Sequence, residues 1–423
     1  MAEMKFSFGR YPMTITITPT RLRGAITPPP SKSQAHRLLI AAALADGESH
    51  ITNLSYSQDI LATLSCLEQL GAKLVREERA VRIQGLRPRP TGTLPHLDCR
   101  ESGSTLRFMI PVALAAAGGG KFTGAGRLLE RPQGPFQTLF SEKGIAFDHT
   151  PQAITAQGRL MAGEYALAGD VSSQFITGLL YALPLLDGAS RIRLTTPLES
   201  KNYVDMTLLA LEAFGVTAQE TEYGYFIPGN QAYQSRDMAV ESDYSQSAFY
   251  YAANGLGSEV EIHGLNPTSA QGDMRIVPYY LKLCGKGRVE LDVSQCPDLV
   301  PALALHAALR DGEDTAIVNA ARLRIKESDR LATVTEELNN LGANVEEFED
   351  HLLIHGVSSL HGGRVQAHND HRIAMMLAIA ATRADGPVIL SGAESVNKSY
   401  PSFWEDYQAL GGQITVHPEG DAL

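Results

Sequence analysis

Hydrophobic and polar positions follow a cycle that recurs along the whole chain. A turn rich in Ser or Asp opens an Ala-rich apolar helix six times, for example before residues 38–44 and 373–381. Ser and Asp suit helix starts because their side-chain oxygens accept hydrogen bonds from the free N–H groups of the first turn. The six openings are Ser31-Lys32-Ser33, Ser102-Gly103-Ser104, Val171-Ser172-Ser173, Tyr244-Ser245-Gln246-Ser247, Cys296-Pro297-Asp298 and Asn369-Asp370-His371.

A second helix follows in each cycle and ends at a glycine, which supplies the left-handed backbone just past a helix end. Successive glycines lie 73, 71, 70, 57 and 69 residues apart, and such comparable steps indicate an internal repeat. Each repeat predicts helix, strand, helix, strand and strand. The alternating Thr/Ile run at residues 13–19 predicts an edge strand before the first repeat. The glycines are Gly71, Gly144, Gly215, Gly285, Gly342 and Gly411.

Six alternating repeats predict an α/β protein with two domains of three repeats each. A chain of 423 residues is too long for one ordinary hydrophobic core. We place the domain break in the polar stretch at residues 235–241. A doubly wound α/β sheet would also gather Ser and Gly at helix starts, but no GxGxxG motif follows a predicted strand, and the glycine triplet at residues 118–120 lacks that spacing.

Composition indicates the class of protein and the compartment in which it is expected. A hydrophobic fraction of 44% and a mean hydropathy of −0.10 are typical of a globular soluble protein. No apolar stretch is long enough to span a bilayer, and residues 1–30 hold no apolar block of the signal-peptide kind. Four scattered cysteines form no CxxC pair, which argues against a disulfide framework or a zinc site. We therefore expect a cytoplasmic protein.

The net charge of −11 repels nucleic acid, acidic membranes and anionic metabolites at long range. An anionic substrate would thus require a local basic cluster. Lys32, Ser33 and Arg37 follow three prolines at the first helix start, where free N–H groups, a hydroxyl and two cations predict an anion site. The alternative is a solvated helix cap with a chance lysine.

Other candidates lie at later turns of the first half. Small residues around Gly103 let a ligand approach the backbone. Arg127 follows a Gly-Ala-Gly turn and could hold a carboxylate or phosphate with two parallel bonds, although a surface arginine is the plain alternative. Ser172, Ser173 and Gln174 suit a phosphate or a polyol, and capping alone would also explain them.

In the second half, Asp298 heads an apolar helix and is either an N-cap or a functional carboxylate near the helix dipole. Six of the nine residues in RLRIKESDR are charged, which predicts a salt-bridged surface or two cations with a carboxylate for proton transfer. Arg372 and Lys398 are ambiguous alone. Taken together, two domains facing each other by their helix starts would form a cleft with about seven basic side chains.

These segments resemble the 5-enolpyruvylshikimate-3-phosphate synthase family over nearly the whole chain, through SKSxxxR, GSTLR, the GxxR…RP loop, VSSQF, SKNYVD, PD, RIKESDR, NDHR and NKSYP. The resemblance implies two similar inside-out α/β domains, each of three βαβαββ units, with a ligand cleft between them. It implies residues 23–239 as one domain and residues 1–22 plus 240–423 as the other. It also implies a monomer that transfers the enolpyruvyl group of phosphoenolpyruvate to the 5-hydroxyl of shikimate 3-phosphate, without a metal, an organic cofactor, nucleic acid or a membrane.

The resemblance also assigns site residues. Asp298 removes the proton of the hydroxyl, and Glu327 is the candidate for proton transfer at the methylene carbon, with Lys32 as the alternative donor. Glu327 needs a raised pKa for this role, whereas its cationic neighbours push the pKa down. The shikimate 3-phosphate residues are Lys32, Ser33, Arg37, Ser172, Ser173, Gln174, Ser200, Tyr203, Asp298 and Lys326. The phosphoenolpyruvate residues are Lys32, Gly103, Arg127, Gln174, Arg330, Arg372 and Lys398.

Two departures from the family pattern and two rival functions stand beside this assignment. Glu101 and Arg322 replace residues that are often Asn in the family, and Arg322 receives no role here. The related UDP-N-acetylglucosamine enolpyruvyl transferases usually carry a reactive Cys in a loop that here, at residues 118–134, has none. A non-catalytic anion-binding protein would not need Asp298 and Glu327 beside the basic cluster.

Overall fold

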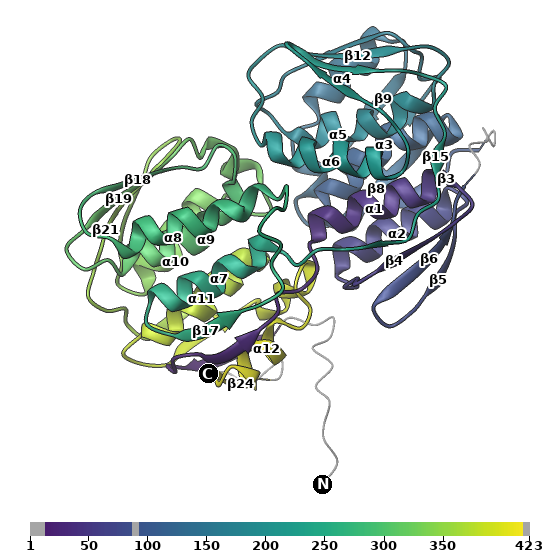
Figure 1. The fold of residues 1–423 in the computed structure, drawn as a ribbon. Helices are drawn as coiled ribbons and strands as arrows, with labels where there is room; N and C mark the ends of the chain where they lie inside the picture. Colours follow the sequence, from purple (N-terminus) through teal and green to yellow (C-terminus); the bar gives the residue numbers. More distant parts are fainter. Residues whose placement is uncertain (1–12, 87–92, 418–423) are drawn as a thin grey trace. The chain divides into compact units, whose positions relative to one another are not determined.

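The structure is a computed structural model that describes residues 13–86 and 93–417. The chain packs as two compact units (Figure 1). Of the described residues, the first unit comprises 29–86, 93–243 and 265–274, and the second comprises 13–28, 244–264 and 275–417. The expected domain limits were residues 23 and 239. The strand Arg23–Ile26 (β2) belongs to the second unit because it pairs with Glu259–Ile262 (β17).

The first unit contains three four-stranded sheets of one design. In each sheet two parallel strands are followed by two antiparallel ones. The short strands Ala45–Asp46 (β3) and Tyr233–Gln234 (β15) form an additional parallel pair. The sheet orders are β16 (Met238–Ala239), β4 (Glu48–Thr52), β6 (Ala80–Gln84), β5 (Lys73–Arg76); β7 (His96–Asp98), β8 (Gly119–Thr123), β10 (Ile154–Gln157), β9 (Ala146–His149); and β11 (Glu164–Leu167), β12 (Ser190–Leu194), β14 (Gly224–Ile227), β13 (Gln219–Thr221).

Helices fill the interior of this unit and the sheets surround them (Figure 1). The helices that open each repeat are apolar on nearly every side, so they are buried almost throughout. This arrangement confirms the expected inside-out α/β fold. The opening helices are α1 (Lys32–Leu44), α3 (Gly103–Ala117) and α5 (Ser173–Ala182), and their partners are α2 (Gln58–Gln69), α4 (Gly134–Glu142) and α6 (Lys201–Ala213).

The second unit repeats the design in two of its three sheets. The complete sheets are β18 (Val289–Asp292), β19 (Asp314–Val318), β21 (Leu352–His355), β20 (Asn344–Glu347); and β22 (Gly363–Gln366), β23 (Val388–Ser391), β1 (Thr14–Thr18), β24 (Gln413–His417). The helices are α7 (Tyr244–Gly255), α8 (Ile276–Cys284), α9 (Val300–Ala308), α10 (Arg330–Asn340), α11 (His371–Ala380) and α12 (Phe403–Ala409). Short 3-10 segments include η4 (Pro297–Leu299) and η7 (Ala393–Lys398).

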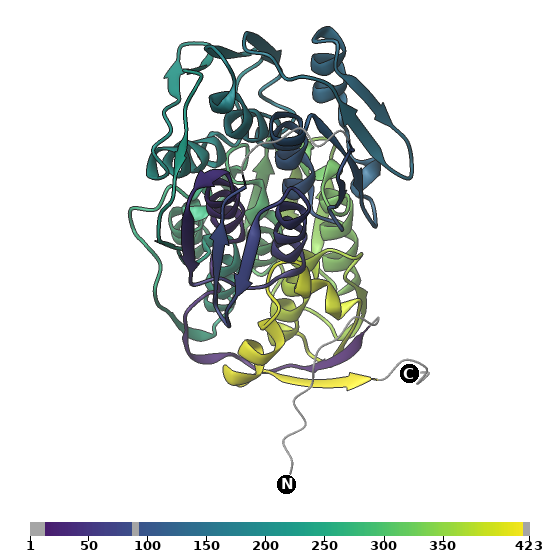
Figure 2. The ribbon, with the colours of Figure 1, turned by 90° about the vertical axis from the view of Figure 1, so that its right-hand side faces the viewer.

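The prediction that residues 13–19 form an edge strand is wrong. Strand β1 hydrogen-bonds to β23 on one side and to β24 on the other, so it is an inner strand of the last sheet. Ile15 and Ile17 are fully buried as a result. Figure 2 shows the purple N-terminal strand beside the yellow C-terminal strand. The sequence alone could not place β1 because both neighbours come from the far end of the chain.

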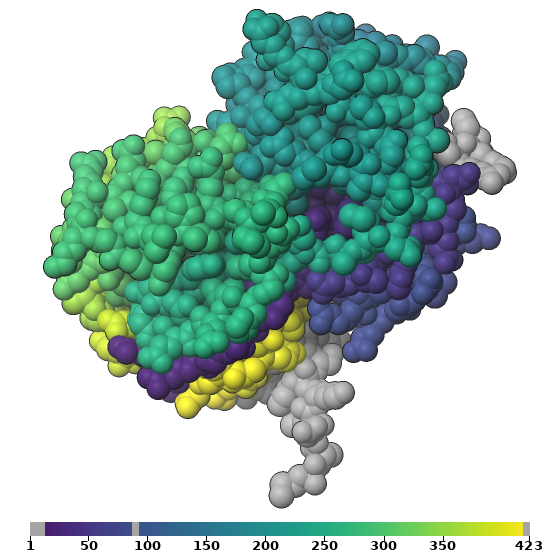
Figure 3. All heavy atoms as spheres, viewed as in Figure 1, coloured from purple at the N-terminus to yellow at the C-terminus, as the bar shows by residue number. Residues whose placement is uncertain are grey.

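The fourth repeat lacks the closing hairpin, so the predicted cycle is wrong there. Helix α8 leads directly into β18, and the described sheet of this repeat contains only β17 and β2. This omission accounts for the short step of 57 residues between glycines. Gly285 has a φ of −78°, whereas the other five predicted glycines are left-handed. In Figure 3 the purple residues of β2 run between green and yellow residues, where the Arg23 N–H donates to the Leu410 carbonyl at 2.9 Å.

All six predicted openings start helices, and four of them use a side-chain cap. Ser31, Ser102, Ser172 and Asp370 accept hydrogen bonds from backbone N–H groups of the first turn. The polar residues of the openings therefore lie at helix N-termini, where free N–H groups and the helix dipole favour anions. Within the described residues, no helix combines the length and the apolar character that crossing a membrane requires.

Candidate active site

Two carboxylates hold Lys32 at the start of α1 in the first unit. The Lys32 ammonium lies 2.8 Å from Asp59 Oδ2, and its backbone N–H donates to Asp243 Oδ2 at 3.1 Å. Asp243 itself is fixed because its N–H donates to the Pro29 carbonyl. The lysine therefore has a defined position at a helix N-terminus, as an anion-binding residue requires.

Arg37 lies one turn further along α1 and ties that helix to α6. Its guanidinium donates to the carbonyls of Ser33 at 2.6 Å and Tyr203 at 2.7 Å, and to the Thr207 hydroxyl at 3.0 Å. The side chain is only 2% exposed, and burial lowers the pKa of Arg37. Arg37 thus orients Ser33 and Tyr203 through their backbones. The Tyr203 hydroxyl in turn donates to Asp273 Oδ2 at 3.1 Å.

Gln174 joins the starts of α5 and α3. Its amide donates to the Ser104 hydroxyl at 3.0 Å, and its carbonyl accepts from Arg107 Nη1 at 2.8 Å. Gly103 lies against this pair, because a Cβ added there would be 2.8 Å from Arg131 Nη1 and 3.5 Å from the Gln174 carbonyl oxygen. A side chain at position 103 would therefore displace the polar groups assembled at these two helix starts.

Three further predicted residues lie at different depths in this unit. Ser173 is buried at the start of α5. Ser200 precedes α6 with a left-handed φ of 54°, and its carbonyl accepts from the Tyr203 N–H. Arg127 is 48% exposed and its described contact is a loose ion pair, 3.6 Å from Glu130. The structure thus gathers the serines with Tyr203 and Gln174 at helix starts, and leaves Arg127 accessible on its loop.

Arg330 is the centre of the charged cluster in the second unit. Its side chain is 1% exposed, and its guanidinium donates to Asp370 Oδ2 at 2.8 Å, Asp370 Oδ1 at 3.2 Å, Asp298 Oδ1 at 2.9 Å and Glu327 Oε2 at 2.8 Å. These four hydrogen bonds use most of the five N–H groups of a guanidinium. The surrounding carboxylates outweigh burial, so the pKa of Arg330 is raised and the residue stays charged.

Asp298 connects the starts of α9 and α11. Its carboxylate accepts from Arg372 Nη2 at 3.0 Å and Arg330 Nη1 at 2.9 Å, and Lys326 Nζ lies 3.3 Å away. Burial alone would raise the pKa of Asp298, but these three cations hold it well below its usual range. Asp298 is therefore ionised at neutral pH and is a weak base while all three cations remain on it.

Asp370 was predicted only as part of a helix opening, and the structure gives it a larger role. It caps α11 through the Arg372 N–H at 2.9 Å and accepts from the Ser328 hydroxyl at 3.0 Å as well as from Arg330. Burial raises the pKa of Asp370, but the charge of Arg330 prevails and lowers it to about 2. The acidic residue two positions before a predicted ligand arginine was the available signal in the sequence.

This pKa shift predicts an acid-sensitive contribution to stability. A carboxyl group whose pKa falls from 3.8 to about 2 on folding contributes about 2 kcal/mol above pH 4. The contribution is lost as the pH falls from about 4 to about 2. Urea unfolding across this range should show the wild-type protein losing about 2 kcal/mol more than Asp370→Asn. The exposed Asp350→Asn is the control, and equal pH slopes for the wild type and Asp370→Asn would contradict the prediction.

The remaining predicted cations of this unit lie beside the same cluster. Burial and the charge of Arg330 lower the pKa of Lys326, which therefore loses part of its preference for the protonated form. Lys398 is buried at the end of η7, and its ammonium donates to the Asn369 carbonyl at 2.5 Å. The structure thus brings Asp298, Lys326, Glu327 and Arg330 together with Arg372, as the sequence predicted from separate motifs.

The sequence did not reveal the carboxylates that hold the ligand residues of the first unit. Asp59 lies in the first turn of α2, Asp243 directly precedes α7, and Asp273 lies in the connection between β17 and α8. Each lies 27 or more residues from the side chain or backbone group that it holds, so only folding brings it to its partner. These carboxylates hold Lys32 and the Tyr203 hydroxyl in fixed positions in this structure.

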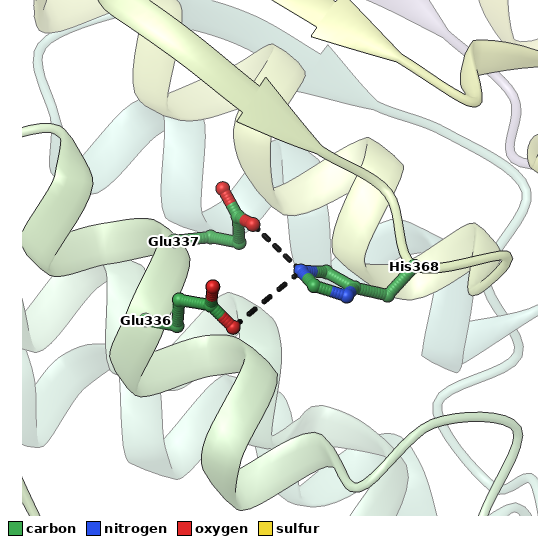
Figure 4. A group of neighbouring side chains, drawn as sticks. All are labelled: Glu336, Glu337 and His368. Carbon is green, nitrogen blue, oxygen red and sulfur yellow. Dashed lines mark hydrogen bonds and ion pairs between the residues drawn. The ribbon is translucent and has the colours of Figure 1, made fainter.

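One group of potential metal ligands occurs in the described part of the chain, outside the charged cluster. Glu336, Glu337 and His368 direct two carboxylates and an imidazole toward one another (Figure 4). The Glu337–His368 pair is 2.6 Å apart, shorter than the roughly 3.3 Å between ligands of a tetrahedral zinc ion. The second oxygen of Glu337 accepts the Gln366 N–H at 3.1 Å. The group is therefore a hydrogen-bonded carboxylate–imidazole pair with a second carboxylate nearby in this structure.

The chain thus combines repeated inside-out α/β units with cations and carboxylates at their helix starts. The profile of the EPSP synthase (3-phosphoshikimate 1-carboxyvinyltransferase) family matches residues 17–407. The chain belongs to this family, so the resemblance drawn from the motifs is confirmed.

Individual relatives agree with the family match. The chain is 46% identical over 419 residues to the 3-phosphoshikimate 1-carboxyvinyltransferase of Clostridium kluyveri, covering 95% of this chain and 98% of the relative. It is 45% identical over 424 residues to that of Clostridium beijerinckii, covering 94% and 97%. A solved structure of EPSP synthase from Acinetobacter baumannii is similar with a TM-score of 0.77 at 26% identity, covering 96% of this chain and 100% of that one.

Proposed function

We propose that this protein transfers the enolpyruvyl group of phosphoenolpyruvate to the 5-hydroxyl of shikimate 3-phosphate by addition and elimination, releasing phosphate. The supporting observation is the cluster around Arg330, in which three cations share Asp298 and a second carboxylate, Glu327, lies on Arg330. In a chain with a net charge of −11, such a cluster supplies the cations that an anionic substrate needs. The two carboxylates supply the groups for proton transfer.

The residues proposed to bind shikimate 3-phosphate differ in how they act. Lys32 carries a charge to the start of α1, whereas Arg37 acts chiefly by holding Ser33 and Tyr203 in place. Hydroxyl and amide groups at the starts of α5 and α6 suit hydrogen bonds to a phosphate or a polyol. The full proposed set is Lys32, Ser33, Arg37, Ser172, Ser173, Gln174, Ser200, Tyr203, Asp298 and Lys326.

The residues proposed for phosphoenolpyruvate are mostly cations already engaged by carboxylates. Arg330 donates four hydrogen bonds to protein carboxylates, so a bound phosphate or carboxylate must share or replace some of them. Arg372 is likewise already engaged, because its guanidinium donates to the Asp298 carboxylate. The full proposed set is Lys32, Gly103, Arg127, Gln174, Arg330, Arg372 and Lys398.

This exchange of partners gives Asp298 its proposed role as a base. When anionic phosphoenolpyruvate binds, Arg372, Arg330 and Lys326 share their charge with it, so the pKa of Asp298 rises from its depressed value. Asp298 then accepts the proton of the 5-hydroxyl as that oxygen attacks C2 of phosphoenolpyruvate. Asp298 thus becomes a stronger base only when phosphoenolpyruvate is bound.

The other proton moves at the methylene carbon. Glu327 is proposed to protonate that carbon during addition, with Lys32 as the alternative donor, and the carbon becomes a methyl group. In elimination the methyl group returns a proton to the group that supplied it, the double bond forms again, and the C–O bond to phosphate breaks with its electron pair on phosphate. The hydrogen bond from Arg330 favours ionised Glu327, so its role as an acid requires that bond to weaken in the complex.

The direct test is the release of phosphate from phosphoenolpyruvate with different acceptors. We expect release with shikimate 3-phosphate and none with UDP-N-acetylglucosamine. Release only with the nucleotide sugar would move the chain to the related transferase. Tight binding of the phosphorylated ligands without release would indicate a non-catalytic anion-binding protein.

A second prediction concerns Arg127, which is exposed and loosely paired. Arg127→Ala should leave the free energy of unfolding within about 0.5 kcal/mol of the wild type because the side chain is not buried. It should raise KM for phosphoenolpyruvate about tenfold or more because a charge-assisted pair with the substrate is lost. Glu130→Ala on the same loop is the control. An unchanged KM would place Arg127 outside the site.

In the cell we propose that the protein acts in the cytoplasm as a monomer on these two small molecules, in the shikimate pathway of aromatic amino-acid biosynthesis. No nucleic acid or membrane is part of the proposed reaction. Sedimentation of the purified protein with and without shikimate 3-phosphate would test the proposed monomer.

A further inference from the structure

One buried carboxylate holds the connection between β22 and α11. Glu337 is 2% exposed, near the end of α10. One of its oxygens accepts the Gln366 N–H at 3.1 Å, and the other lies 2.6 Å from His368 Nε2 (Figure 4). Two hydrogen bonds to residues only two positions apart fix the path of this short connection. A buried carboxylate that lost these partners would carry the cost of its desolvation.

The connection adopts backbone angles that are uncommon for residues with a Cβ. His368 has a φ of 50° and Asn369 a φ of 53°, so two successive non-glycine residues are left-handed. Left-handed backbone costs free energy in residues with a Cβ, and it persists where the surroundings hold it. Here Glu337 holds the imidazole of His368, and the Lys398 ammonium donates to the Asn369 carbonyl.

The same turn sets the positions of the cations proposed to bind phosphoenolpyruvate. Its carbonyl at Asn369 is the partner of Lys398, and the next residue, Asp370, accepts from Arg330 and from the Arg372 N–H. A turn that relaxed toward ordinary backbone angles would move both the carbonyl and the Asp370 carboxylate. Lys398 and Arg330 would then lose a fixed partner, and the start of α11, which carries Arg372, would lose its cap.

We infer that Glu337 and His368 are positioning residues for the phosphoenolpyruvate half of the site, because their hydrogen bond holds the left-handed turn that carries the partners of Lys398 and Arg330 and caps the helix of Arg372. Neither residue belongs to the set proposed to touch a substrate. The inference rests on the proposed function for the identity of the ligand. It assigns a role in that reaction to a carboxylate buried on α10, a full two turns from Arg330.

The neighbouring residue offers a matched control. Glu336 lies beside Glu337 on α10 and its carboxylate is 3.8 Å from the same imidazole nitrogen, but its side chain is 60% exposed. An exposed contact at that distance contributes little to the position of the turn. The same substitution at positions 336 and 337 therefore separates loss of negative charge near His368 from loss of the buried anchor.

The experiment compares Glu337→Ala with Glu336→Ala in steady-state assays that vary each substrate separately. Glu337→Ala should raise KM for phosphoenolpyruvate about tenfold or more, since small displacements of ligand groups weaken binding strongly. KM for shikimate 3-phosphate should stay within about twofold because eight of the ten residues proposed to bind it, all except Asp298 and Lys326, lie in the first unit. Glu336→Ala should match the wild type. Glu337→Gln should be intermediate, because its amide carbonyl still accepts the Gln366 N–H.

A second variant and a comparison of kcat with KM distinguish the positioning role from a purely structural one. If Glu337→Ala does not fold, His368→Asn tests the same turn, because Asn tolerates left-handed backbone but is too short to replace the imidazole. It should raise KM for phosphoenolpyruvate in the same direction. A merely structural role would lower kcat through loss of native protein and leave both KM values unchanged, and this result would overturn the inference.

Three other results would contradict either the positioning role or the proposed function. Equal rises in both KM values would also overturn the positioning role. Loss of wild-type activity in EDTA with recovery in Zn²⁺ would overturn it in favour of a metal site formed by Glu336, Glu337 and His368. Failure of the proposed function would appear differently, as no phosphate release by the wild-type protein with shikimate 3-phosphate.

Discussion

Asp298→Asn is expected to lower kcat for phosphate release by a factor of about 10² to 10⁴, the usual contribution of a positioned general base. Arg330 and Arg372 bond different oxygens of Asp298, so the single amide oxygen of Asn can still accept from one of them, but it cannot accept a proton from the 5-hydroxyl. The substitution also removes the negative charge that competes with phosphoenolpyruvate for these cations. KM for phosphoenolpyruvate should therefore fall together with kcat.

The matched control is Asp329→Asn. Asp329 caps α10 and pairs with the partly exposed Arg324, and Asn caps helices as well as Asp does. This control should keep the kcat and both KM values of the wild type within about twofold. A kcat for Asp298→Asn near that of the wild type would remove Asp298 from the reaction. A rise in KM for phosphoenolpyruvate would contradict the competition between Asp298 and the substrate.

Arg330→Gln is expected to lower the free energy of unfolding by about 3–5 kcal/mol, because removing one partner of a buried ion pair leaves uncompensated charge. The carboxylates of Asp298, Glu327 and Asp370 would then face one another around a neutral side chain. The loss should shrink as the pH falls toward about 4, because protonation of these carboxylates relieves their repulsion.

Urea unfolding followed by the fluorescence of Trp404 is the appropriate measurement. Trp404 is the single tryptophan of the chain and is fully buried in the second unit, together with Arg330. Arg324→Gln is the control, since Arg324 is 29% exposed and should lose less than about 1 kcal/mol. A loss for Arg330→Gln as small as that of Arg324→Gln would show that the buried network contributes no net stability.

Much of the site followed from local patterns. The helix openings at residues 31–33, 102–104 and 369–371 were predictable because capping chemistry is a property of a few adjacent residues. The motif RLRIKESDR was recognisable for the same reason. It did not reveal which of its charges would be buried. The structure leaves Arg324 partly exposed in surface ion pairs and surrounds Arg330 with three carboxylates.

The sequence by itself determined the repeat, the six helix openings, the inside-out α/β fold and the family, because each depends on short-range patterns or on whole-chain similarity. Only the tertiary structure decided that β1 is an inner strand and that the fourth repeat has no hairpin. It also decided that Glu337 anchors the turn before Arg372. These features depend on hydrogen bonds between residues distant in sequence, whose partners are chosen by the packing of the whole unit and not by local preference.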